Sequence, residues 1–154
     1  MRWAFAPVLT TPTRARRQLA DQLCRWGITG PESESVLLVA HELVANAVDH
    51  ARTALELAVS FDGRAVVVAV QDGSMLEPRL RPLDLATARG RGLQMVDALA
   101  KSWHWVQHLD GKTVQAVIIT RLVVCRMVLV ACGRLTGPTS ACPCAARDRS
   151  ASGR

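Results

Sequence analysis

Apolar side chains follow a helical period over residues 33–52. At about 100° per residue, Glu42, Asn46 and Asp49 fall on one arc of this helix, with His50 at its edge. Most other positions in the stretch are Val, Leu or Ala. A helix that is apolar nearly all round belongs in a core, where carboxylates and amides are rare without a partner. The pattern therefore predicts a buried helix whose polar stripe is paired within the protein, faces a cleft holding water, a metal or a ligand, or simply meets solvent.

Two apolar runs after this helix have the composition of strands. Leu55–Phe61 and Val66–Gln71 are separated by Asp62-Gly63, which is a hairpin turn signal. The second run is almost continuous Val, as suits a central strand buried on both faces. It ends at Asp72, Gly73 and Ser74, where Asp-Gly is usually only a turn.

The other elements complete the order β-α-α-β-β-loop-α-β-β. Trp3–Phe5 predicts a short first strand, and the helix after it has an apolar face and ends at Gly27. Residues 77–89 are rich in Pro and Arg and have no period, so they predict a loop. The last predicted elements are a helix over Leu93–Ala100, with Leu93, Met95, Val96 and Leu99 inward, and strands over Ser102–His108 and Thr113–Leu122. This order predicts a two-layer α/β sandwich, in which helices cover one face of a mixed, mostly antiparallel sheet.

Length and composition fit a cytoplasmic protein with one folded domain. The chain has 154 residues, enough for one core, and no run of 18 uncharged apolar residues that would predict a membrane span. The first residues are interrupted by Pro7 too early for a convincing signal peptide. We therefore expect a cytoplasmic location and no membrane partner.

The excess of basic residues is mostly a property of the C-terminal tail. Residues 1–124 hold 14 Lys and Arg against 12 Asp and Glu, whereas residues 125–154 hold five Arg and one Asp. The domain shows no basic stripe with interleaved aromatic residues, so we expect no direct nucleic-acid binding. Residues 123–154 are predicted to be a basic, Cys-containing extension that is largely disordered.

Four short motifs occur in a fixed order along the chain. They are E-L-V-A-N-A-V-D-H-A (42–51), V-Q-D-G-S-M-L-E-P-R (70–79), G-R-G-L-Q-M-V-D-A-L-A (90–100) and G-K-T-V-Q-A (111–116). Together they resemble the N, G1 and G2 boxes and the closing strand of the GHKL superfamily of gyrase, Hsp90, histidine kinases and MutL. The resemblance is to its small single-domain branch, the anti-sigma-factor serine/threonine kinases. It implies a histidine kinase/Hsp90-like ATPase domain over residues 1–122, with the Bergerat-type ATP-binding fold.

The resemblance implies roles for the residues of the first two motifs. Asn46 coordinates Mg²⁺, and Glu42 is the general base for the attacking hydroxyl or water; the alternative is a Glu–Asn pair that only braces a helix. Asp72 accepts a hydrogen bond from the adenine amino group of ATP. Ser74 either shapes the adenine end or stabilises a turn. His50 either approaches the phosphates or packs as a hydrogen-bonded histidine.

The later motifs imply phosphate and adenine contacts. Gly90, Arg91 and Gly92 open a helix whose N-terminal N–H groups suit a phosphate, and glycine lets the backbone come close to it. Leu93 continues this support, while Arg91 either touches phosphate or faces solvent. Thr113 matches a threonine that closes the adenine pocket in relatives. Lys112 is expected to be a turn charge, and Asp49, which departs from the family pattern, either adds a carboxylate near the site or lies on the surface.

Three functions are compatible with these motifs. The first is an ATP-dependent protein kinase that phosphorylates a serine on an anti-anti-sigma (STAS-like) partner, with a sigma factor as an additional or alternative partner. The alternative is an ATP-dependent protein-binding module, an anti-sigma factor with little or no kinase activity. A detached histidine kinase domain is disfavoured, because no helical hairpin with a phospho-accepting His precedes residue 42. Relatives often form homodimers, but no residue here identifies an interface.

Overall fold

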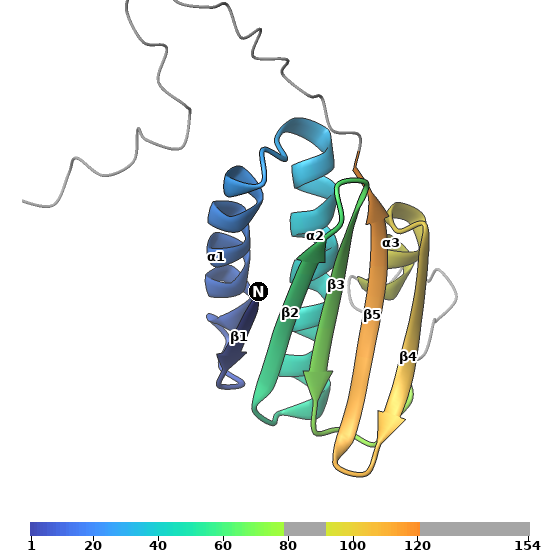
Figure 1. Ribbon diagram of the computed structural model, residues 1–154. Helices are drawn as coiled ribbons and strands as arrows, with labels where there is room; N and C mark the ends of the chain where they lie inside the picture. The colour runs from blue at the N-terminus through green and yellow to red at the C-terminus, as the bar shows by residue number, and fades with distance from the viewer. Residues whose placement is uncertain (79–91, 121–154) are drawn as a thin grey trace, which may run out of the picture. The chain divides into compact units, whose positions relative to one another are not determined.

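Five strands form one sheet in the order β1-β2-β3-β5-β4, and every neighbouring pair is antiparallel (Figure 1). The computed structural model describes residues 1–78 and 92–120. The strands are β1 Arg2–Phe5, β2 Leu55–Phe61, β3 Ala65–Asp72, β4 Ser102–His108 and β5 Gly111–Ile119. The predicted α/β sandwich is thus confirmed, but the sheet is antiparallel throughout these strands rather than mixed. The reason is that β5 returns between β3 and β4, which run in the same direction without pairing.

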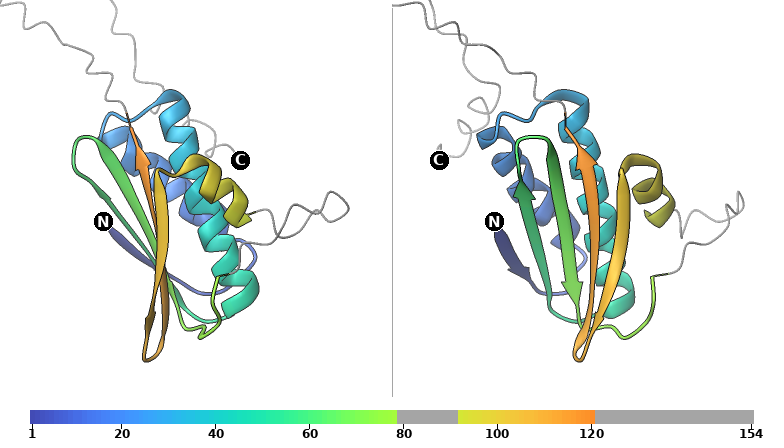
Figure 2. Two further views of the ribbon diagram at one scale, coloured as in Figure 1. Left: turned by 90° about the vertical axis from the view of Figure 1, so that its right-hand side faces the viewer. Right: turned by 45° about the vertical axis from the view of Figure 1, so that its right-hand side comes forward.

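The helices all lie against one face of the sheet (Figure 2). They are α1 Thr11–Arg25, α2 Gly30–Asn46 and α3 Gly92–Leu99, and α2 continues into a π-helical turn, η1 Ala47–Ala51. The turn ends at Arg52, whose φ of 55° is left-handed, and whose N–H donates to the Ala47 carbonyl. In the described part of the chain, no helix combines the length and apolarity needed to cross a membrane.

The core fills the space between the sheet and the helices. Val36, Val39 and Val44 of α2 are fully buried, as are Val66 and Val68 of β3. On the outer face of β3, Val67 and Ala69 are half-buried and Gln71 is exposed, so the prediction of a strand buried on both faces is wrong. The face of α3 also differs from its prediction, because Leu93 and Val96 are buried whereas Leu99 is exposed.

Several sequence predictions lie outside the described residues. They include most of the loop predicted over residues 77–89, the first two residues of the Gly90-Arg91-Gly92 motif and the extension over residues 123–154. Where residues are described, the predicted elements are present with shifts of a few residues at their ends. Helix α2, for example, begins at Gly30, and β5 begins at Gly111.

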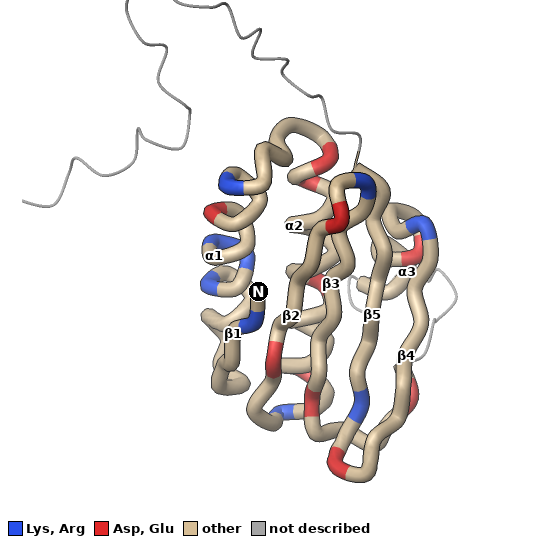
Figure 3. Tube along the Cα trace, viewed as in Figure 1, with Lys and Arg blue, Asp and Glu red and all other residues tan. Residues whose placement is uncertain are grey.

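Charged residues are gathered on α1 and near the ends of the strands, as Figure 3 shows. Arg16 of α1, which is half-buried, is paired at 2.8 Å with the exposed Glu34 of α2. In the β2–β3 turn, the Asp62 carboxylate accepts hydrogen bonds from the N–H groups of Arg64 and Ala65, and these bonds lower the pKa of Asp62. The predicted Asp62-Gly63 hairpin is therefore confirmed.

Gly111 tests how tightly β5 is held against the end of β3. Its φ is +152°, and a Cβ atom there would lie 2.0 Å from the Asp72 carbonyl oxygen. Because neither backbone can yield cheaply, we expect Gly111→Ala to lower the free energy of unfolding by about 1–3 kcal/mol or more. Urea denaturation measures this change.

Gly63→Ala is the matched control for this variant. Gly63 has a φ of +94°, but a Cβ there would meet nothing within 4 Å, so the control isolates the cost of the backbone angle from that of the clash. An equal loss of stability in the two variants would contradict the close packing of Gly111 on Asp72.

Candidate functional site

The polar stripe of α2 faces the start of α3. Glu42 and Asn46 lie one turn apart on α2, and both are half-buried. A Cβ atom built on Gly92 would lie 2.6 Å from the Glu42 Oε2 atom and 3.3 Å and 3.4 Å from the Asn46 amide nitrogen and oxygen. The structure therefore brings together three of the residues singled out by the sequence, and only glycine fits at residue 92 without moving them.

The start of α3 offers backbone donors beside these side chains. The first N–H groups of a helix have no partner within it and carry the positive end of its dipole. In α3 these groups lie next to a carboxylate and an amide, because Gly92 is the first residue of the helix. The side chain of Leu93 is buried in the core and anchors the helix.

The π-helical turn presents two further polar residues of the stripe. Asp49 and His50 lie in η1 and are exposed, whereas Ala47 and Val48 of the same turn are buried. A π-helical turn widens the helix by one residue and is common at functional sites. Neither side chain is packed in the core, so the reading of His50 as a buried, packed histidine does not hold.

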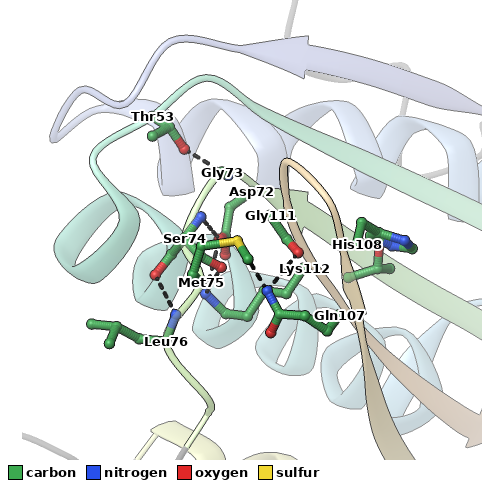
Figure 4. A network of polar contacts seen from close by, with 11 residues as sticks. Thr53, Asp72, Gly73, Ser74, Met75, Leu76, Gln107, His108, Gly111 and Lys112 are labelled. Atoms are coloured by element: carbon green, nitrogen blue, oxygen red, sulfur yellow. Dashed lines mark hydrogen bonds and ion pairs between the residues drawn. The ribbon is translucent and has the colours of Figure 1, made fainter.

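A second polar cluster lies at the end of β3. The Asp72 side chain is 4% exposed, and its Oδ1 atom accepts hydrogen bonds of 2.8 Å from the Ser74 N–H and from the Lys112 ammonium (Figure 4). Lys112 lies opposite Asp72 in the β3–β5 register and is itself 6% exposed. The expectation that Lys112 is a turn charge is therefore wrong.

The turn after Asp72 is fixed by side-chain hydroxyls. The Gly73 N–H donates to Thr53 Oγ1 at 2.8 Å, which ties this turn to the segment directly after η1. The Ser74 hydroxyl accepts a hydrogen bond from the Leu76 N–H at 3.2 Å. The hydroxyl of Ser74 thus stabilises the turn, while its backbone N–H orients Asp72.

Thr113 lies apart from this cluster. Successive residues of a strand point to opposite faces, so Thr113 and Lys112 are on different sides of the sheet. The Thr113 hydroxyl is 2.9 Å from His108 Nε2, on β4, and in Figure 4 His108 points away from Asp72. The predicted place of Thr113 in the adenine pocket requires its side chain to lie near Asp72. In the structure it lies on the other face of the sheet.

Sequence reasoning missed three residues that shape this end of the site. They are Lys112, Thr53 and Gln107, whose amide donates to the Gly111 carbonyl and to the Met75 sulfur. A signal for Lys112 was present, because it precedes Val114, Ala116 and Ile118 in the alternation that marks the buried face of β5. Thr53 and Gln107 carry no comparable signal, since their contacts depend on how distant segments meet.

The Asp72–Lys112 pair makes a prediction about stability. Removing one partner of a buried ion pair leaves the other charge uncompensated, which typically costs about 3–5 kcal/mol, whereas replacing both charges costs less. We therefore expect Asp72→Asn to be strongly destabilised, and the double variant Asp72→Asn/Lys112→Met to recover much of the loss. Chemical denaturation of the wild type, of the single variants Asp72→Asn and Lys112→Met and of the double variant checks the prediction. Asp49→Asn, at an exposed position, is the control. Additive losses in the double variant would show that the two groups are not coupled.

Comparison with known proteins places the chain in a family. The family described as "Histidine kinase-like ATPase domain" matches residues 5–118. The crystal structure of the RsbU and RsbW domains of Rv1364c from Mycobacterium tuberculosis is similar with a TM-score of 0.56 and 19% identity, over 79% of this chain and 33% of that one. The chain thus spans about a third of that structure, and the likeness is one of fold. No curated protein sequence matches. Because the family match covers most of the sequence, the chain belongs to the histidine kinase-like ATPase domains.

Proposed function

We propose that this protein binds ATP and acts as an anti-sigma-factor-type serine/threonine protein kinase. The observation that carries the proposal is the placement of Gly92, which opens α3 directly against Glu42 and Asn46. A helix N-terminus without a side chain in the way is suited to a phosphate. A carboxylate and an amide beside it supply the base and the metal ligand that phosphoryl transfer needs.

The residues around Gly92 fit a magnesium nucleotide. Mg²⁺ prefers oxygen ligands and usually keeps several waters and phosphate oxygens, so one amide oxygen from Asn46 is a suitable protein ligand. When bound, the metal would neutralise charge on the phosphates. The start of α3, with Gly90 and Arg91 before it, is the proposed binding segment for the phosphates, and exposed His50 is a further proposed contact.

Glu42 is the proposed general base. The oxygen of a partner serine attacks the γ-phosphorus of ATP while the carboxylate of Glu42 takes the hydroxyl proton. The bond from the γ-phosphorus to the bridging oxygen breaks, and ADP leaves with the electron pair of that bond. A positioned base of this kind typically contributes about 10²–10⁴-fold to the rate.

Asp72 is the proposed reader of the base. Its ionised carboxylate only accepts hydrogen bonds, so it suits the 6-amino group of adenine, whereas guanine carries an oxygen acceptor there. The ion pair with Lys112 supports this role, because a contact of 2.8 Å fixes the position of the buried carboxylate.

The proposed substrate is a serine on an anti-anti-sigma (STAS-like) protein, and a sigma factor is the second proposed partner. A location in the cytoplasm, where ATP is present, is consistent with both partners. The binding module without kinase activity would use the same nucleotide site, so the distinction is made by measuring transfer as well as binding.

Calorimetry and phosphate transfer on Glu42→Ala test the proposal. We expect the wild type to bind ATP with Mg²⁺ in preference to GTP, and Glu42→Ala to bind ATP with similar affinity but to transfer phosphate to STAS-like proteins of the same organism about 10²–10⁴-fold more slowly. Glu34→Ala, which changes an exposed glutamate on the same helix, is the control. Failure of the wild type to bind ATP would refute the proposal. Binding without transfer would select the binding module.

Gly92→Ala tests the contact on which the proposal rests. The new methyl group would meet the end of a flexible side chain, Glu42 Oε2, so we expect the fold to survive while the carboxylate is displaced. Thermal melting should stay within a few degrees of the wild type, and phosphate transfer should fall at least tenfold. Wild-type transfer rates in a folded Gly92→Ala protein would contradict the placement of the base.

A further inference from the structure

The function proposed above gives Lys112 no contact with the nucleotide, yet this lysine is buried in an ion pair with Asp72. The sequence contains only two lysines, and the other, Lys101, is exposed. Lysine is almost never fully buried unless it is paired. Lys112 is 6% exposed and lies on the same side of the sheet as the core residues of β5.

The contacts of Asp72 are unequal between its two oxygens. Oδ1 accepts both the Ser74 N–H and the Lys112 ammonium, each at 2.8 Å. A carboxylate oxygen has two lone pairs, so these two donors occupy Oδ1. Two contacts on one oxygen also fix the rotation of the carboxylate. Oδ2 is then the oxygen to which a ligand could donate a hydrogen bond.

The ammonium is held in place from its own side as well. The Lys112 Nζ atom lies 3.5 Å from the Ser74 carbonyl oxygen, in addition to its bond to Asp72. The backbone before it is fixed, because Gly111 packs so closely on Asp72 that no Cβ fits there. The ion pair is therefore formed before any ligand binds. Binding then does not have to supply free energy to order these two side chains.

We propose that Lys112 is a positioning residue for base recognition, which occupies Oδ1 of Asp72 so that Oδ2 is presented to the exocyclic amino group of a 6-aminopurine. This inference rests on the proposed ATP site and deepens it. Because both donors lie on Oδ1, the oxygen presented to the base is an acceptor. Lys112 thus acts through Asp72, and selectivity for the amino group depends on it.

The test compares ATP with purine riboside triphosphate, which lacks the 6-amino group, and with GTP. A hydrogen bond to a charged group contributes enough for about a tenfold to hundredfold difference in affinity, so the wild type should prefer ATP over purine riboside triphosphate by that factor. In Lys112→Met we expect this ratio to fall below about threefold, with little change for purine riboside triphosphate. Exposed Lys101→Met is the matched control and should keep the full ratio.

Each of three other outcomes would overturn the inference. One is a Lys112→Met protein that keeps the wild-type preference for ATP. Another is an equal loss of affinity for all three nucleotides, which would show that the lysine only supports the fold. The third is tighter ATP binding in Lys112→Met, which would mean that the lysine competes with the base.

A measurement on the wild type covers the case in which Lys112→Met does not fold. With lysine labelled by ¹⁵N, the chain gives only two side-chain ammonium signals. The buried Lys112 signal should persist, with slow proton exchange, when ATP is bound. Its loss on ATP binding would show that the nucleotide displaces the lysine, and the inference would fail.

The failure of this inference can be told from failure of the proposed function. If the wild type binds none of the three nucleotides, the ATP site is absent and both fail. If the wild type prefers ATP and folded Lys112→Met does so equally, the ATP site stands and only the role of Lys112 is lost.

Discussion

The antiparallel pairing of β3 with β5 is the constraint on which the site depends. A slip of one residue in this register would turn every side chain of β5 to the other face. In the observed register Lys112 meets Asp72 on the helix side, while Val114, Ala116 and Ile118 enter the core. The same pairing that buries the apolar residues therefore also aligns the buried ion pair of Asp72 and Lys112. Core packing and the chemistry at the end of β3 are set by a single choice of register.

Helix α2 supplies the other half of the site for a similar reason. Its apolar surface packs against α1, α3 and the sheet. Its polar residues Glu42 and Asn46 lie against the start of α3, where the missing side chain of Gly92 leaves room for them. After η1, the Thr53 hydroxyl holds the turn that follows Asp72. A single stretch of chain thus connects the stripe to the cluster at the end of β3.

The sequence was informative where a feature depends on periodicity and less so where it depends on which strands meet. The stripe of Glu42 and Asn46 follows from helical period alone, and the order of elements predicted the sandwich. The mixed sheet was wrong because hydrophobic pattern does not tell where β5 inserts. Lys112 was misread because Asp-Gly-Lys looks like a turn, although alternation along β5 places it inward. Thr113 was assigned by resemblance, and the same alternation puts it on the opposite face.

The burial of Lys112 also has a practical consequence for covalent labelling. Amine-directed reagents attack free amines, and the chain has only two lysines besides its N-terminus. The N-terminal amine donates to the Val59 carbonyl, and Lys112 is enclosed by Asp72 and Ser74. Lys101, exposed between α3 and β4, is thus the most accessible side-chain amine. A single fluorophore could be attached there, at the end of α3 opposite to Gly92, without altering any residue of the candidate site.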